Sequence, residues 1–128
     1  MKLTPALVVA AALVSSVSAT SYDNCCCTKK QPSGNWGCDD DAGAAVINDY
    51  NGRYAWSAYT WKTSVLYKNG PKYPGKYFYA TGNGKGKNGD HKIGAQEIGA
   101  GCERHQAGQS CFNIPGGQCI DYTGKKVC

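Results

Sequence analysis

The residues best suited to chemistry form a charged group near the C-terminal end, which contains Glu97, Glu103, Arg104 and His105. A carboxylate, an imidazole and a guanidinium supply a base, an acid and a cation, which is the set that in-line cleavage of a phosphodiester requires. Other catalytic sets are poorly represented, because the chain has two histidines and no nucleophile-elbow sequence. If all eight cysteines form disulfides, a Cys–His pair is excluded as well.

A second segment bears on the same chemistry. Tyr73-Pro74-Gly75-Lys76-Tyr77 resembles the Tyr-Pro-His stretch that small secreted fungal guanyl-type ribonucleases carry on a strand. Gly75 stands at the position of that family's histidine, and the order of elements also differs. We therefore expect no catalytic residue and no enzymatic activity, with a secreted ribonuclease-like protein as an alternative. Glu103-Arg104-His105 is then a solvated, internally ion-paired turn between Cys102 and Cys111.

The cysteines form two clusters separated by a long cysteine-free centre. They are Cys25, Cys26, Cys27 and Cys38 near the start, and Cys102, Cys111, Cys119 and Cys128 near the end. Their irregular gaps do not fit a zinc site, and an even count favours a disulfide framework made in an oxidising compartment. Neighbours in the triple run cannot bond without strain, so we expect its thiols to leave separately, mostly toward the C-terminal cluster. The main alternative is a Cys27–Cys38 bond with one bond inside the C-terminal cluster.

The first residues have the pattern of a secretory signal peptide. Met1-Lys2 gives a positive start, an apolar run follows from Leu3 to Val14, and small residues end at Ala19. We expect a signal peptide over residues 1–19 and a single secreted, extracellular, disulfide-rich domain over residues 20–128. No later apolar stretch is long enough to span a membrane. Loss of Lys2 lowers the formal net charge from +5 to +4, which favours anionic surfaces and falls short of a nucleic-acid-binding signature.

One segment predicts a helix. Three aspartates, Asp39-Asp40-Asp41, precede the small apolar stretch from Ala42 to Tyr50, and Asn51-Gly52 follows it. Carboxylates cap the free N–H groups of a first turn and offset the positive end of the helix dipole, and glycine ends a helix. Capping explains the aspartates better than calcium binding does, because a calcium loop needs a glycine turn and a distal glutamate.

From Arg53 onward an alternation of period two predicts β-structure. Two aromatic strands, 54–67 and 73–79, form a hairpin or two neighbouring strands of a meander, with a bulge or bend where the alternation slips between Ala58 and Tyr59. Shorter strands follow over residues 91–102, 111–114 and 118–122, with a turn at 123–126. Together these segments predict a mainly β fold, a small disulfide-stapled β-barrel or sandwich with one short helix.

The most conspicuous side chains are aromatic residues interleaved with lysines. In a chain with little Leu, Ile or Phe, part of this set must build the core, and the other strand face would display Tyr and Trp beside Lys. Residues 81–90 form a glycine–lysine loop that holds two further lysines in water. The predicted binding surface consists of Tyr59, Trp61, Tyr67, Lys72, Tyr77, Lys85 and Lys87. No metal or cofactor is expected, and an uncovered sheet edge would allow a homodimer.

The layout as a whole resembles the small secreted cysteine-rich effectors of filamentous fungi, and among them the hypersensitive-response-inducing elicitors. The resemblance is carried by Cys25-Cys26-Cys27, the aromatic centre without cysteines and the spaced C-terminal cysteines. It implies a secreted, non-enzymatic, β-rich protein with a role in virulence or plant defence. The implied partner is a host protein or a cell-wall glycan, and not nucleic acid. An antifungal or killer-type toxin shares this layout and is the second alternative.

Overall fold

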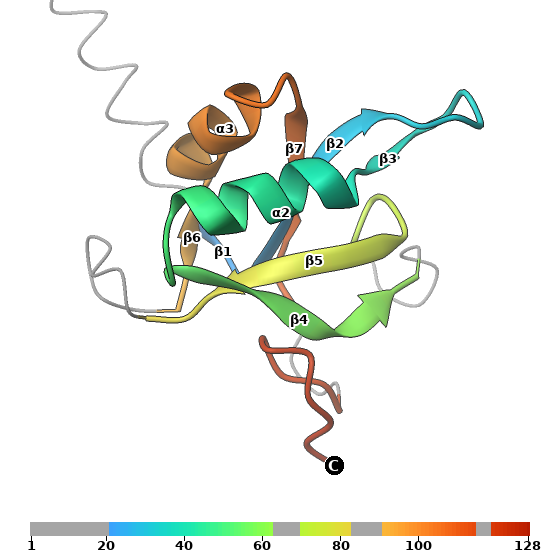
Figure 1. Ribbon diagram of the computed structural model, residues 1–128. Helices are drawn as coiled ribbons and strands as arrows, with labels where there is room; N and C mark the ends of the chain where they lie inside the picture. The colour runs from blue at the N-terminus through green and yellow to red at the C-terminus, as the bar shows by residue number, and fades with distance from the viewer. Residues whose placement is uncertain (1–20, 63–69, 83–90, 115–118) are drawn as a thin grey trace, which may run out of the picture.

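The computed structural model describes residues 21–62, 70–82, 91–114 and 119–128 (Figure 1). The expected signal peptide, residues 1–19, lies outside these ranges, as do Tyr67, Lys85 and Lys87 of the predicted binding surface. The strands are β1 (Ser21–Tyr22), β2 (Asn24–Lys30), β3 (Trp36–Cys38), β4 (Tyr54–Trp61), β5 (Gly75–Ala80), β6 (Ile93–Gly94) and β7 (Gly108–Phe112). The helices are α2 (Asp40–Asp49) and α3 (Ala95–Glu103).

Strand β2 is the centre of a five-stranded antiparallel sheet. The order is β3-β2-β5-β4, and β7 pairs with the opposite edge of β2, so that Cys25 lies between Phe78 of β5 and Cys111 of β7. Strands β1 and β6 form a separate pair. The described residues contain two helices where one was expected, and Figure 1 shows α2 lying across the sheet. The described strands do not close into a barrel, whereas a sandwich-like small β fold is consistent with this layering.

The three consecutive cysteines of β2 divide the core into two clusters. Successive side chains of a strand point to opposite faces, so Cys25 and Cys27 share one face and Cys26 points to the other. The first face carries a cluster of buried residues from both helices and from β4, β5 and β6. On the second face, Cys26 packs with Trp61, Tyr77 and Phe112.

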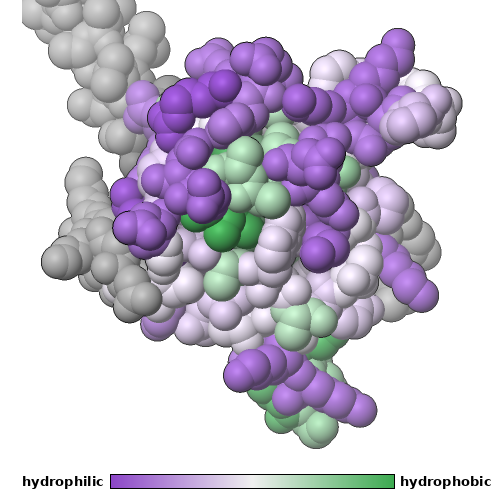
Figure 2. Space-filling model, in the orientation of Figure 1, coloured by the Kyte–Doolittle hydropathy of each residue, from purple (hydrophilic) through white to green (hydrophobic). Residues whose placement is uncertain are grey.

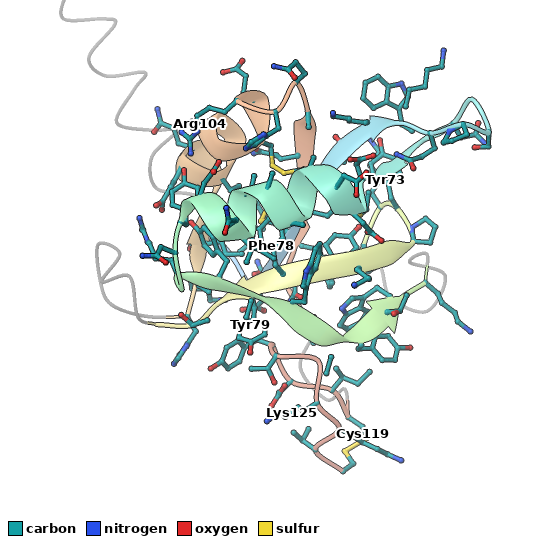
Figure 3. All side chains as sticks on the ribbon, in the orientation of Figure 1. Tyr73, Phe78, Tyr79, Arg104, Cys119 and Lys125 are labelled. Atoms are coloured by element: carbon teal, nitrogen blue, oxygen red, sulfur yellow. A yellow bond between two sulfur atoms is a disulfide. The ribbon has the colours of Figure 1, made fainter. Side chains whose placement is uncertain are left out.

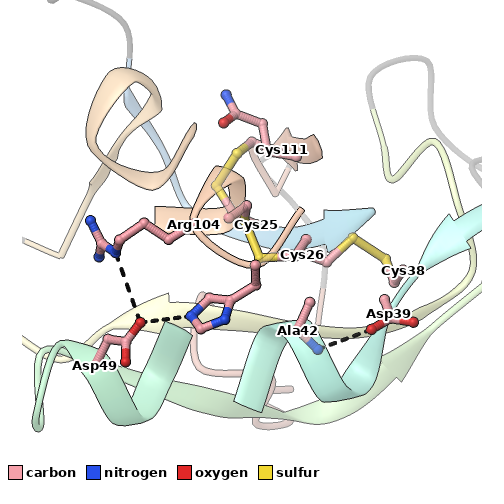
Figure 4. Close-up of a disulfide and its surroundings, with 12 residues drawn as sticks. Cys25, Cys26, Cys38, Asp39, Ala42, Asp49, Arg104 and Cys111 are labelled. Carbon is pink, nitrogen blue, oxygen red and sulfur yellow. Dashed lines mark hydrogen bonds and ion pairs between the residues drawn. A yellow bond between two sulfur atoms is a disulfide. The ribbon is translucent and has the colours of Figure 1, made fainter. Parts of the chain in front are cut away.

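Four disulfides hold this arrangement: Cys25–Cys111, Cys26–Cys38, Cys27–Cys102 and Cys119–Cys128. Figure 4 shows the first two of them. The prediction that the thiols of the triple run leave separately is confirmed. The prediction that most bonds join the two clusters is wrong, because two bonds join the clusters and the other two each lie within one cluster. The alternative had the correct form but named Cys27 instead of Cys26. Cys38 lies opposite Thr28 in the β2–β3 pairing. Its side chain therefore projects to the same face as those of Thr28 and Cys26, and to the opposite face from that of Cys27. Four disulfides indicate an extracellular or otherwise oxidising environment.

The predicted helix is confirmed as α2. Asp39 is its N-cap residue, and its Oδ2 atom accepts a hydrogen bond of 2.9 Å from the backbone N–H of Ala42. Ala42 and Val46 are buried against the sheet, as their spacing of four residues requires. The chain leaves the helix through Gly52, whose φ of 94° lies in the left-handed region.

The predicted aromatic hairpin is confirmed as the antiparallel pair of β4 and β5. Trp56 lies opposite Phe78, whereas Thr60 lies opposite Lys76, and the register shifts between these two pairs. The predicted bulge is therefore present in the segment where the alternation slips. Residues 63–69 of the predicted first strand lie outside the described residues.

The prediction of a strand over residues 91–102 is wrong. The segment contains the two residues of β6 and then helix α3. Ile98 and Cys102 are four residues apart and fully buried, so the apolar positions follow the helical period. The glycines that suggested strand breaks allow close packing, because a Cβ atom at Gly101 would lie 3.0 Å from the ring of Tyr50.

Residues 119–128 form a turn that packs on the sheet. The predicted strand at 118–122 is reduced to a single bridge at Ile120, while the predicted turn is confirmed, with Gly124 at a φ of 84°. The Asp121 carboxylate accepts hydrogen bonds from the Thr123 hydroxyl (2.6 Å) and backbone N–H (2.9 Å), which hold the pKa of Asp121 below its ordinary value. The Thr123 carbonyl accepts a 2.9 Å hydrogen bond from the N–H of Ala58, which attaches the turn to the bulge of β4.

Candidate binding surfaces

Two aromatic residues of the predicted binding surface are core residues instead. Trp61 is 2% exposed and Tyr77 is fully buried, and each ring packs edge-on against Phe112 with centroids 5.0 Å apart. The Tyr77 hydroxyl donates a 2.7 Å hydrogen bond to the carbonyl of Tyr73. Burial raises the pKa of Tyr77 to about 12. The expectation that Trp61 and Tyr77 are displayed on the surface is thus corrected, because their strand face is covered by β7 and the C-terminal segment.

The other described members of the predicted surface lie at the periphery. Tyr59 is half-buried and packs edge-on against Trp61, with ring centroids 4.7 Å apart. Lys72 is exposed, and its Nζ atom lies 5.5 Å from the ring centroid of Tyr73. A lysine beside an aromatic ring gains a cation–π attraction and leaves both groups accessible from one side.

A similar pair was not singled out from the sequence. The exposed Lys76 places its Nζ atom 4.6 Å from the ring centroid of Trp56, on the helix face of the sheet. Trp56 is held there by α2, because a Cβ atom at Gly43 would lie 2.7 Å from its ring. The alternation of β5 could have indicated this pair, since it places Lys76 and Phe78 on the same face, opposite to Tyr77.

Sequence reasoning also missed Trp36, which is 56% exposed at the start of β3. The β2–β3 hairpin turns through Gln31–Asn35, where the N–H groups of Gly34 and Gln31 donate 2.8 Å hydrogen bonds to the carbonyls of Gln31 and Asn35. Lys30 lies directly opposite Trp36 in the register. The signal was available, because Pro32-Ser33-Gly34-Asn35 is a turn sequence between two cysteines.

The charged group near the C-terminal end is ion-paired with α2 rather than internally. His105 Nε2 lies 2.7 Å from Asp49 Oδ2, and Arg104 Nε lies 4.0 Å from the same oxygen (Figure 4). The guanidinium carbons of Arg53 and Arg104 each lie 5.4 Å from the ring centroid of Tyr50. These contacts join the C-terminal ends of the two helices.

Of the two acids in this group, Glu97 has a different partner. Glu97 Oε2 forms an ion pair with Arg53 Nη2 at 2.6 Å, whereas Glu103 is exposed. Burial, with a further contribution from the charge of Glu97, raises the pKa of Tyr54 far above its ordinary value. Figure 3 shows Arg104 and Tyr73 at opposite ends of α2. The two parts of the ribonuclease resemblance therefore do not share one site.

Within the described ranges, no group of three or more His, Cys, Asp or Glu side chains is arranged to hold a metal ion. No described helix is both long and apolar enough to cross a membrane. Figure 2 shows a largely polar face with small hydrophobic areas over α2 and at the C-terminal segment. Comparisons of the chain with protein-family models, with curated proteins and with solved structures found no match.

Proposed function

We propose that this protein is a secreted, non-enzymatic effector or elicitor that binds a host protein or cell-wall component of a plant through surface aromatic and lysine side chains. The observation that supports this proposal best is the set of lysine–aromatic pairs on the surface. Lys76 lies beside Trp56, Lys72 beside Tyr73, and Lys30 opposite Trp36. Aromatic rings and nearby cations recur at binding surfaces because they bury a large area at a small cost in conformational entropy.

The scaffold is suited to work outside a cell. Cys25, Cys26, Cys27 and Cys102 are at most 2% exposed, so reductants and proteases reach the central cross-links with difficulty. Loops of 86 and 75 residues are closed by Cys25–Cys111 and Cys27–Cys102. Closing loops of this length constrains the unfolded chain by about 4 kcal/mol each in the entropic model.

Infiltration of purified, fully oxidised protein into leaves tests the proposal. The expected result is a local defence response that is lost after reduction and alkylation. A Lys72→Ala/Lys76→Ala variant should give a weaker response. A matched Lys125→Ala/Lys126→Ala variant, which loses the same charge from the exposed C-terminal turn, should keep the response. The proposal fails if the protein gives no response and if deletion of its gene leaves virulence unchanged.

One observation favours a second candidate, a ribonuclease-like activity. The His105–Asp49 contact of 2.7 Å has the form of an imidazole oriented by a carboxylate, with Arg104 on the same carboxylate. Incubation of the protein with total RNA tests this candidate. It requires cleavage that disappears in His105→Ala and that Lys126→Ala, in the exposed C-terminal turn, leaves intact. Growth inhibition of competing fungi by the same preparation would instead support the toxin.

A further inference from the structure

The β2–β3 hairpin projects from the body of the molecule (Figure 1). Its strand β3 begins with Trp36, one of the two large hydrophobic side chains that are exposed in the described part of the chain. The other is Val127, in the C-terminal segment. An indole ring exposed to 56% at a projecting turn contributes little to the core, so its apolar face is free to contact a ligand.

The hairpin presents Trp36 together with a cation. Residues that lie directly opposite in an antiparallel pair project to the same face, and Lys30 is the register partner of Trp36. The Cys26–Cys38 disulfide fixes the base of the hairpin on that face. Two 2.8 Å backbone hydrogen bonds close its turn. The backbone that carries the ring is therefore held in place before binding, which reduces the entropic cost of binding.

A second lysine–aromatic pair lies at the same end of the sheet. A Cβ atom at Gly75 would lie 3.2 Å from the Cβ of Cys38, so β5 begins where β3 ends. Tyr73 precedes Gly75 by two residues, as Trp36 precedes Cys38, and Lys72 lies over the Tyr73 ring. Helix α2 packs through Ala42 and Val46 on the opposite face of the sheet, the face of Cys25 and Cys27, and its N-cap residue Asp39 accepts a 3.5 Å hydrogen bond from Gln31 Nε2 at the hairpin turn. Two lysine–aromatic pairs thus lie at one end of the sheet, and the surface between them is the candidate binding path.

We propose that the β2–β3 hairpin anchors the protein to an acidic polysaccharide. Trp36 stacks on the face of a sugar ring, and Lys30 and Lys72 pair with uronate carboxylates along the chain. Charge-assisted contacts of this kind orient an anionic polymer, and the ring supplies the apolar contact. This inference rests on the proposed binding role, and it names the class of cell-wall component and the residues that bind it.

The residues beside Trp36 favour this ligand over other anionic surfaces. A membrane interface is bound by several apolar side chains on one face, whereas the turn next to Trp36 consists of Pro32, Ser33, Gly34 and Asn35. Nucleic acid is bound by many cations that follow the phosphate backbone, whereas two lysines flank this path. Small hydroxyl and amide side chains next to an indole match the hydroxyl groups of a sugar.

The test is calorimetric titration of the oxidised protein with oligogalacturonides of defined length. The parent protein should bind them, and Trp36→Ala should weaken binding about tenfold or more, as removal of a central aromatic anchor does. Trp36→Tyr should restore most of the affinity. The matched variant Val127→Ala, at the other exposed apolar side chain, should bind like the parent. Equal melting temperatures for all variants show that a loss of binding is not a loss of folding.

Charge is tested separately with methyl-esterified oligogalacturonides, which keep the rings and lose the carboxylates. Lys30→Ala should weaken binding of the acidic oligomer several-fold and leave the weaker binding of the esterified oligomer unchanged. The proposal is overturned if Trp36→Ala binds the acidic oligomer like the parent. It is also overturned if the parent prefers phosphatidylglycerol vesicles or single-stranded RNA. A leaf response without oligogalacturonide binding refutes this inference and leaves the proposed function standing, whereas binding without a leaf response does the reverse.

Discussion

The attachment of the C-terminal turn to strand β4 depends on one buried glycine, Gly124. Its φ of 84° is unfavourable for other residues. A Cβ atom at this position would lie 2.6 Å from the backbone N of Tyr59 and 2.7 Å from that of Ala58, and it would overlap Ser57 Oγ. Because Ala58 N–H also donates to the Thr123 carbonyl at 2.9 Å, neither segment can move away without breaking the hydrogen bond that joins them.

The cost of Gly124→Ala can be separated into two parts. The left-handed conformation costs an alanine about 1 kcal/mol. Gly52 has a φ of 94° with no atom within 4 Å of an added Cβ, so Gly52→Ala measures this part alone. At Gly124 the overlap with backbone atoms adds about 1–3 kcal/mol, and loss of the Ala58–Thr123 hydrogen bond adds about 1 kcal/mol. We therefore expect about 3–5 kcal/mol for Gly124→Ala against about 1 kcal/mol for Gly52→Ala.

Thermal unfolding with the disulfides intact measures this difference. A domain of this size loses about 5 °C in Tm for each kcal/mol, so the Tm of Gly52→Ala should fall by about 5 °C and that of Gly124→Ala by about 15–25 °C. If the turn detaches without global unfolding, hydrogen exchange should accelerate at the amide of Ala58 in Gly124→Ala and not in Gly52→Ala. Equal Tm shifts together with unchanged exchange at Ala58 would refute the proposed packing.

Three further outcomes follow from burial, titration and capping. Mild reduction and alkylation should label the exposed Cys119 and Cys128 before any other cysteine, and peptide mapping that finds earlier label in the buried Cys27 would contradict this order. The folded-state pKa of Tyr77, about 12, lies above its ordinary value of 10.0. The stabilising contribution of the Tyr77 hydroxyl is therefore complete below pH 10 and is lost between about pH 10 and 12. In denaturant titrations, Tyr77→Phe should lose less stability than the parent over that interval. Asp39→Ala should cost about 1 kcal/mol of unfolding free energy through loss of the helix cap, whereas Asp39→Asn, which also caps, should cost far less, and equal losses would show that the carboxylate charge matters more than the hydrogen bond.

Local chemistry made parts of the fold predictable from the sequence. Asp39 and Gly52 mark the two ends of α2 by mechanisms that act within a few residues, a cap and a left-handed exit. The slip in alternation at Ala58 and Tyr59 likewise reports a register shift in the same strand. In each case the signal and the structure that it predicts lie in one segment.

Helix α3 shows why other parts were not predictable. Its glycines lower the local helix propensity, and the helix is maintained by burial of Ile98 and by the bond of Cys102 to Cys27 on a strand 75 residues away. The space at Gly101 is filled by the ring of Tyr50, the C-cap residue of α2. Such distant partners leave no mark in the segment itself, so tertiary contacts override propensity here.

The same reason explains why the sequence did not show which aromatic residues are exposed. Strand alternation says which side chains share a face and does not say which face is covered. Trp61 and Tyr77 are buried because β7 brings Phe112 over their face, while Trp36 is exposed because it lies on the projecting β2–β3 hairpin. Residue type alone ranked the central aromatics above Trp36.

The triple cysteine run gives the chain its two-sided construction. Because side chains alternate along β2, Cys25 and Cys27 must bond on the helix side and Cys26 on the other. On the helix side the bonds reach β7 and α3, which come from the C-terminal half. On the other side the Cys26–Cys38 bond reaches only 12 residues along the chain and fixes the β2–β3 hairpin. One run of three residues therefore fastens the core on one face of the sheet and fixes the exposed Trp36 hairpin on the other, so the stability of the core and the position of Trp36 depend on the same strand.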